Sequence, residues 1–206
     1  MTGKTKTRKS AVTIGRPRNF DMDAALSRAL EVFWRKGYEG ATICDLTAAM
    51  GINPPSLYAA FGNKEGLFCM ALERYADKNE AFLQATLALP KARDGIAALL
   101  RGAADSLTDK CNPAGCLLVH GVAGAGEHAE CIRQELNARR AASEKVIRER
   151  LKRSKAEGEL PDDADPASLA RYIATVMHGM AVQAAGGASR AELRRVADTA
   201  MAAWPA

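Results

Sequence analysis

The sequence predicts an all-α fold. Apolar residues recur at the three- and four-residue spacing of amphipathic helices along nearly the whole chain. No alternating strand pattern competes with them, and turn signals do not recur at the short, regular spacing of all-β folds. Of the 206 residues, 48% are hydrophobic and only 5% are aromatic. The chain can therefore bury a core, and an all-β sandwich is unexpected.

Breaker and cap residues divide the chain into helices. Glycine or proline ends most of the expected helices, and Ser, Thr, Asn or Asp precedes most of them. Thr42 opens a capping-box pattern, and Asn53 is followed by a proline that suits the first helical position. The two short helices that they begin flank a turn at Gly51. In order, we expect helices over residues 21–36, 42–50, 53–61, 63–89, 96–107, 116–122, 127–157, 165–189 and 189–204.

The basic residues are unevenly distributed. Of 29 Lys and Arg, six lie in residues 1–19, which contain no acid, while the remaining chain holds 23 bases against 24 acids. We therefore expect a flexible basic arm, residues 1–19, that meets an anionic partner. No stretch suits a signal peptide or a membrane span, and the five cysteines include no C-x-x-C pair. These features favour a cytoplasmic protein.

The two short helices expected within residues 42–61 have the helix-turn-helix arrangement, in which the second helix typically enters the DNA major groove. This arrangement alone is a weak indicator, but the residues around it are more specific. They are Gly37-Tyr38, Thr42, Gly51-Ile52-Asn53, Leu57-Tyr58, Phe61, Lys64-Glu65 and Leu67-Phe68. In these motifs, over about residues 20–72, the sequence resembles the TetR family of bacterial transcriptional regulators. Farther along, the resemblance rests on helix number and length and on the segment 115–119.

The resemblance implies an all-helical homodimer that regulates transcription, most often by repression. Residues 20–66 would be a three-helix helix-turn-helix DNA-binding domain, and residues 67–206 a helical ligand-binding and dimerisation domain. A small effector would move the two DNA-reading helices apart and release a palindromic operator. No enzyme is expected, because the sequence lacks G-x-S-x-G, H-E-x-x-H and dinucleotide-binding motifs. No cofactor or metal is expected either.

Three residues are expected to contact DNA phosphates. Thr42 lies at a helix N-terminus, where a hydroxyl and backbone N–H groups can meet a phosphate. Tyr58 matches a tyrosine that family members use on the DNA backbone. Lys64 lies in the first turn of a helix, where the helix dipole disfavours a cation, and a phosphate partner would explain it. Leu57 and Phe61 are assigned to the core.

The expected base contacts involve uncharged side chains. No charged residue occurs from residue 46 through residue 63, so the recognition helix has no Arg or Lys for guanine. The candidates are Asn53, Pro55, Ser56 and Ala59. Asparagine can pair with adenine, whereas Pro55 and Ala59 can contact a thymine methyl group.

The arm supplies the missing cations. Arg16 and Arg18 flank Pro17 directly before the first helix. Two such arginines can enter a narrow, A·T-rich minor groove, where the negative potential is enhanced. We therefore expect both arginines to bind DNA.

Apolar helix faces in the C-terminal part predict a pocket for a small, hydrophobic effector. The residues expected to line it are Leu99, Ala103, Leu107, Cys116, Val119, His120, Ile173, Met177 and His178. The helix over residues 165–189 is apolar around its circumference, so one of its faces should pack on a second copy. The residues expected at the dimer interface are Tyr172, Val176, Met180, Gln183, Leu193, Val196, Ala200 and Trp204.

Other functions stay open. Cys111 and Cys116 lie near an expected helix start, where a thiol pKa is lowered, so a redox- or electrophile-sensing regulator is an alternative. A helical enzyme and a scaffold that does not bind DNA are more remote alternatives. The expected partners are a double-stranded DNA operator, a small-molecule effector and a second copy of the chain, with no membrane.

Overall fold

The computed structural model describes residues 20–121 and 127–205, and every regular element in these ranges is an α-helix, as the sequence predicts. The basic arm lies outside the described residues. No helix in these ranges has the length and apolar composition needed to cross a membrane. The helices are α1 (Met22–Gly40), α2 (Ile43–Met50), α3 (Pro54–Phe61), α4 (Lys64–Leu87), α5 (Ala92–Leu107), α6 (Leu117–His120), α7 (Glu127–Ala156), α8 (Pro166–Ala185) and α9 (Arg190–Ala202).

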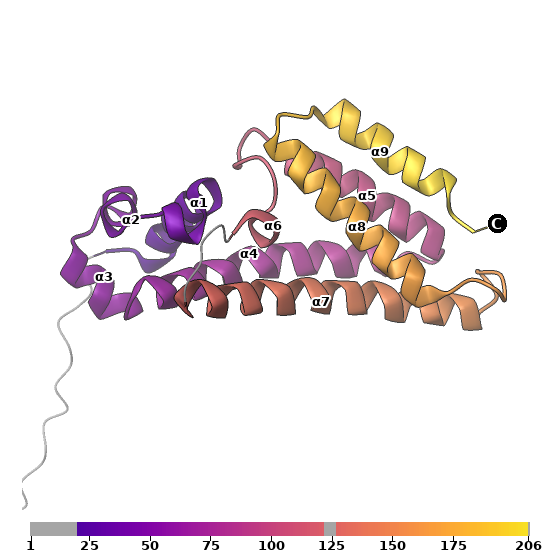
Figure 1. Cartoon of the computed structure of the whole chain (residues 1–206), viewed down its shortest axis with the longest axis horizontal. Helices are drawn as coiled ribbons and strands as arrows, with labels where there is room; N and C mark the ends of the chain where they lie inside the picture. Colours follow the sequence, from indigo (N-terminus) through magenta and orange to yellow (C-terminus); the bar gives the residue numbers. More distant parts are fainter. Residues whose placement is uncertain (1–19, 122–126, 206) are drawn as a thin grey trace, which may run out of the picture.

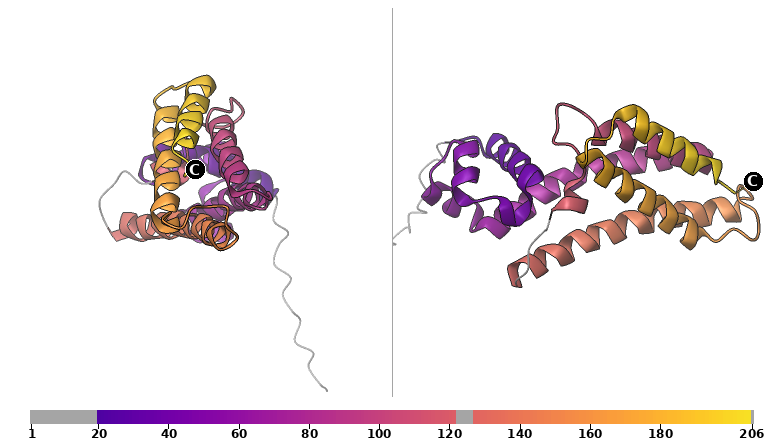
Figure 2. Two further views of the ribbon diagram at one scale, coloured as in Figure 1. Left: turned by 90° about the vertical axis from the view of Figure 1, so that its right-hand side faces the viewer. Right: turned by 45° about the horizontal axis from the view of Figure 1, so that its top comes forward.

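The helices form two groups that two long helices join. Helices α1, α2 and α3 lie together at one end of the molecule, while α5, α8 and α9 lie at the other (Figure 1). The long helices α4 and α7 run side by side between the two ends. Figure 2 shows the short α6 between α1 and α8, and both of these helices contact it. The boundary expected after residue 66 falls inside α4, which belongs to both groups.

Side-chain caps begin the first four helices where the sequence predicts them. Asp21, Thr42, Asn53 and Asn63 each accept a hydrogen bond from a backbone N–H of the helix that follows. Gly51 ends α2 in the left-handed region, with φ 69°, a conformation that glycine adopts without a steric penalty. These local interactions set the angle between α2 and α3 and so confirm the helix-turn-helix.

Aromatic side chains fill the core beneath the helix-turn-helix. The ring of Phe68 meets that of Phe33 edge-on at 5.0 Å between centroids and that of Tyr38 at 5.2 Å. Leu57 and Phe61 hold α3 on this core, as expected. We call this group the N-terminal core; it comprises the buried apolar residues of α1 to α3 and of residues 67–75, together with Leu117, Ile132 and Leu136.

The first helix does not end where the sequence predicts. The main break is at Gly37, with φ 70°, but a further turn continues to Gly40. The positive φ at Gly37 brings the chain against α6, and the backbone N–H of Tyr38 donates to the carbonyl oxygen of Gly121 at 2.8 Å. A Cβ atom at Gly37 would lie 3.5 Å from that oxygen. This long-range contact explains why a local reading of the sequence missed the extra turn.

A second core fills the other end of the molecule. It consists of aliphatic residues of α5, α8 and α9, the distal halves of α4 and α7, and Leu160, and we call it the C-terminal core. Arg150 of α7 is 6% exposed and donates to the carbonyl oxygens of Leu87, Leu89 and Pro90. Glu159 accepts the N–H of Ala92 at 2.8 Å, so α5 begins before the expected residue 96. These contacts fix the corner between α4 and α5.

Candidate nucleic-acid interface and effector domain

The recognition helix presents an uncharged surface. Tyr58 is 48% exposed, and Pro54, Pro55 and Ala59 are exposed as well, whereas Ser56 is half-buried. The opposite face of α3 is anchored in the N-terminal core. The helix is therefore held rigidly while its polar tyrosine and small apolar side chains face outward.

The cap of α3 constrains Asn53. Its Oδ1 accepts the backbone N–H of Ser56 at 2.9 Å, so the planar amide directs Nδ2 away from the helix. A bidentate contact with adenine would require both amide atoms to face the base, which would break this cap. In the capped state, Nδ2 is the group that Asn53 offers to DNA.

The hydroxyl of Thr42 is occupied within the protein. Its Oγ1 accepts from the Asp45 N–H at 3.0 Å and donates to the Asp45 carboxylate at 2.8 Å. Lys36 Nζ binds the same carboxylate at 2.6 Å. The hydrogen bond from Lys36 and those from Thr42 hold the pKa of Asp45 well below its usual range. A negative charge thus already lies at the N-terminus of α2.

Lys64 is placed by an aromatic ring. Its Nζ lies 4.5 Å from the ring centroid of Tyr38, a cation–π contact at the first turn of α4. Partial burial lowers the pKa of this lysine. The contact restricts the side chain and keeps its amine near the N-terminus of α4, on the same domain as α3. The expected minor-groove residues Arg16 and Arg18 lie outside the described residues.

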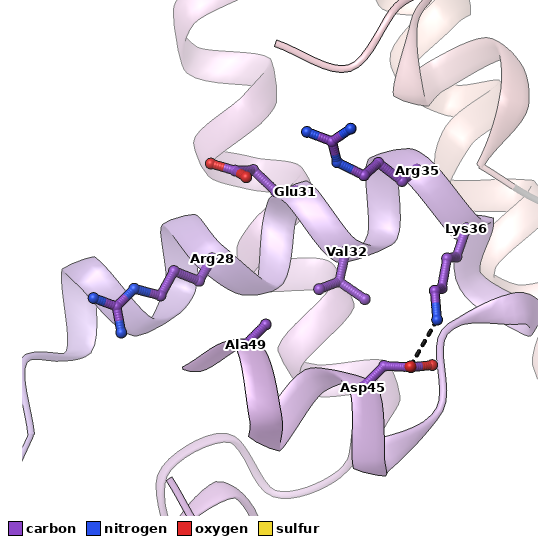
Figure 3. Close-up of a pocket in the computed structure, with 7 residues that line it drawn as sticks. All are labelled: Arg28, Glu31, Val32, Arg35, Lys36, Asp45 and Ala49. Atoms are coloured by element: carbon purple, nitrogen blue, oxygen red, sulfur yellow. Dashed lines mark hydrogen bonds and ion pairs between the residues drawn. The ribbon is translucent and has the colours of Figure 1, made fainter. Parts of the chain in front are cut away.

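A charged hollow of about 320 Å³ lies between α1 and α2 (Figure 3). Val32 and Ala49 form its apolar floor, and the Lys36–Asp45 ion pair closes one side. Its remaining lining residues are Arg28, Glu31 and Arg35. The sequence did not indicate these residues, because they come together only when two helices pack. The hollow differs from the apolar effector pocket expected in the other domain.

The residues expected to line an effector pocket lie in different parts of the described structure. Leu99, Ala103 and Ile173 are buried in the C-terminal core, and Leu107 and Met177 pack against it. The other expected lining residues lie elsewhere. Cys116 packs against the N-terminal core, Val119 and His120 are half-buried on α6, and His178 is half-buried on α8.

The polar surroundings of His178 lie on α7. Burial, and secondarily the charge of Arg140, lower the pKa of this histidine, although Glu144 opposes the shift.

A second hollow, of about 540 Å³, is lined by Lys91, Arg93, Glu159, Trp204 and Pro205. None of the expected effector residues lines either of the two hollows described here.

The expected dimer residues divide into two groups. Tyr172 and Val196 are 40% and 43% exposed, Gln183 is exposed, and Val176 and Trp204 are partly buried. Three others are covered by their own chain, so they are corrected from interface to core: Met180, Leu193 and Ala200. The reason is that α8 and α9 each turn one face towards α5. Val182 on α8 is 52% exposed, although it was not among the residues expected at the interface.

A hydrogen-bonded junction joins the two groups of helices. The indole N–H of Trp34 donates to the carbonyl oxygen of Gly115 at 3.2 Å, and Tyr38 N–H donates to that of Gly121. The Tyr75 hydroxyl donates to Cys116 Sγ at 3.2 Å. Burial and the neighbouring thiol raise the pKa of Tyr75, so the phenol stays protonated as the donor. The sequence carries no signal for these contacts, because their partners are far apart along the chain.

A helix-turn-helix at one end of an all-helical chain is the architecture of a DNA-binding regulator. The family model for bacterial regulatory proteins of the tetR family matches residues 25–69, and that for the tetracyclin repressor-like C-terminal domain matches residues 91–201. The chain therefore belongs to the TetR family of bacterial regulatory proteins, which confirms the resemblance seen in its motifs.

Relatives cover almost the whole chain. The HTH-type transcriptional repressor ComR of Escherichia coli is 36% identical over 193 residues, covering 93% of this chain and 92% of ComR. The structure of the TetR family regulator CifR, a cysteine mutant in complex with a 26-base-pair operator, is similar with a TM-score of 0.89 and 45% identity. That match covers 92% of this chain and 100% of CifR. A putative TetR regulator from Rhodococcus is 39% identical with a TM-score of 0.62, over 90% of this chain and 99% of its own.

Proposed function

We propose that this protein is a transcriptional repressor that binds a palindromic operator as a homodimer and releases it when a small, hydrophobic effector binds. The observation that carries the proposal is the exposed, uncharged face of α3, whose opposite face Leu57 and Phe61 anchor in the N-terminal core. This is the arrangement needed to place one helix in the major groove while its neighbours meet the backbone. Similarity to a regulator solved with operator DNA supports it.

The phosphate contacts would come from helix N-termini and a few side chains. Backbone N–H groups at the start of α2 and α4 suit an anion, and Lys64 adds a positive charge beside the second. The Asp45 carboxylate already lies at the start of α2, where it accepts the backbone N–H of Thr42. A phosphate at this end of α2 would therefore be bound chiefly by Lys36 and by the side chain of Thr42. Tyr58 would donate its exposed hydroxyl to the backbone.

Selection from a random double-stranded DNA pool tests DNA recognition directly. We expect a palindrome whose half-sites lie about one helical turn apart or a multiple of it, bound by two chains. Tyr58→Phe should weaken binding about tenfold, because it removes one hydrogen bond to a charged phosphate. Ser106→Ala, which removes an exposed hydroxyl from α5, is the control and should leave the affinity unchanged. Enrichment of no sequence would contradict the proposal.

The basic arm would add contacts in the minor groove through Arg16 and Arg18. Deletion of residues 1–19 should reduce the slope of log K against log salt by about 0.9 for each lost phosphate contact. The double variant Arg16→Gln/Arg18→Gln separates these two residues from the four other bases of the arm. An unchanged salt slope after the deletion would refute this part of the proposal.

The junction offers a route from the effector domain to the DNA-binding domain. A Cβ atom at Gly115 would lie 3.2 Å from both the carbonyl oxygen of Ala181 and the Cβ of Ala185, so α8 packs directly on this segment. The same segment accepts the hydrogen bonds of Trp34 and Tyr38 on α1. A shift of α8 on effector binding would therefore reach α1 through residues 115–121.

A thiol-sensing regulator is the second candidate. Cys111 and Cys116 are free thiols, and Cys116 lies in the junction with its sulfur hydrogen-bonded by Tyr75. Modification there would displace Tyr75 and disturb the contact with α1. Iodoacetamide should release operator DNA from the protein and from a Cys111→Ser variant, but not from Cys116→Ser. Unchanged DNA binding after complete alkylation would exclude this candidate.

A further inference from the structure

The exposed surface of α3 is poor in the groups that usually read bases. Guanine is most often read by Arg or Lys, and adenine by a bidentate Asn or Gln. The helix contains neither Arg nor Lys, and Asn53 is oriented by its cap so that only Nδ2 faces outward. Ser56 is half-buried, and its backbone N–H is used in the same cap. Hydrogen-bonded base recognition by this helix is therefore limited.

Small apolar groups occupy the remaining surface. Pro55 and Ala59 are exposed and stand four residues apart, so they share one face of the helix. Both side chains are short, which allows the helix backbone to lie deep in the groove. Their outer atoms are C–H groups, and the one apolar group on base edges in the major groove is the C5-methyl of thymine.

We propose that this protein specifies its operator mainly through thymine methyl groups in the major groove, contacted by Pro55 and Ala59. The proposal rests on the proposed DNA-binding function and names the base chemistry that α3 recognises. Removal of one such methyl group should weaken binding about fourfold, which is the transfer free energy of one buried methylene expressed as a ratio of affinities.

The test uses the full chain and the palindrome selected from the random pool. Each thymine in the half-sites is replaced in turn by deoxyuridine, which lacks only the methyl group and keeps every hydrogen-bonding atom. Binding is measured by fluorescence anisotropy. We expect about a fourfold loss at one or two positions of each half-site, and no loss at thymines outside the region that α3 covers.

Protein variants test whether Pro55 and Ala59 are the residues that contact the thymine methyl groups. Ala59→Gly should weaken binding to the thymine operator but have little further effect on the deoxyuridine operator, because the contact is already absent. Ala81→Gly changes an exposed alanine within α4 and is the control for the general effect of glycine in a helix. Pro55→Ala should show the same dependence on the methyl group at a different thymine.

The outcomes are distinct. Equal affinity for thymine and deoxyuridine operators would overturn the methyl proposal and leave the DNA-binding function intact. A deoxyuridine effect that adds fully to Ala59→Gly and to Pro55→Ala would also overturn it, because the methyl groups would then act without these residues. Failure to select any operator would instead count against the proposed function.

Discussion

The two cores of this protein are built from different side chains. Five aromatic residues are buried in the N-terminal core: Phe33, Tyr38, Phe61, Phe68 and Tyr75. Among the described residues, the buried members of the C-terminal core are Ala, Leu, Ile and Met. Aromatic pairs prefer defined geometries, whereas small aliphatic side chains and methionine repack more easily. The N-terminal core is therefore suited to hold α3 in one orientation, whereas the C-terminal core is easier to repack.

The border between the two cores does not follow the order of the sequence. Leu117 of α6 and Ile132 and Leu136 of α7 are buried among residues of α1 and α4. The N-terminal core is thus completed by residues that lie more than 40 positions beyond Tyr75 in the chain. The helices of the DNA-binding domain therefore depend on α6 and α7 for part of their stability, and this dependence links the two domains.

The largest expected effect comes from the residue that crosses this border. Leu136→Ala should cost about 2–5 kcal/mol, because it leaves a cavity in the N-terminal core. Hydrogen exchange should accelerate in α1 and α4 although the substitution lies in α7. Leu193→Ala, in the C-terminal core, is the matched control and should accelerate exchange in α5 and α9 instead. The same exchange pattern from both variants would contradict the division into two cores.

A smaller effect is expected at the junction. Gly115 has φ 88°, and a Cβ atom would meet Ala181, Ala185 and His120 at 3.2 Å. Gly115→Ala should therefore destabilise the protein by about 1–3 kcal/mol. Gly158 has φ 77° with no atom within 4 Å of such a Cβ, so Gly158→Ala carries the backbone strain without the crowding. Equal losses in thermal unfolding would show that the packing of α8 on this segment contributes nothing.

The indole hydrogen bond contributes less. Trp34→Phe removes the donor to Gly115 but keeps a ring near Tyr75, whose centroid lies 4.7 Å from that of Trp34. We expect a loss of about 0.5–1.5 kcal/mol in chemical unfolding, with operator affinity little changed. In the thiol-sensing case, iodoacetamide should release DNA less effectively from this variant. Unchanged release would place the signal elsewhere, such as along α4.

The smallest effect concerns Asp45. Its pKa is lowered in the folded protein, so its contribution is fully present above the usual carboxylate pKa and is lost as the pH falls through the lower, folded value. Asp45→Asn should slightly lower the melting temperature at neutral pH, and the difference from wild type should shrink in strong acid. Asp77→Asn, at an exposed position of α4, serves as the control. If the difference in melting temperature between Asp45→Asn and wild type grew as the pH fell, the hydrogen bonds from Lys36 and Thr42 would not be what stabilises the charged carboxylate.

Local sequence signals determined much of the DNA-binding domain. Caps at Thr42, Asn53 and Asn63 and the turn at Gly51 depend on residues a few positions apart, so the helix-turn-helix could be located from the sequence. The uncharged character of α3 was equally visible. What the sequence could not show was the state of the capping side chains, since the same atoms that suggest DNA contacts are used within the protein.

Only the tertiary structure decided which apolar residues belong to which surface. Met180 and Val182 have similar hydrophobic character on one helix, yet one is 1% and the other 52% exposed. Periodicity assigns residues to a helix face, but the orientation of that face depends on the helices that pack against it. The junction of Trp34 and Tyr38 with residues 115–121 could not be predicted either, because it also depends on how the helices pack. The sequence thus determined the helices and the family, while packing determined how the two domains are joined.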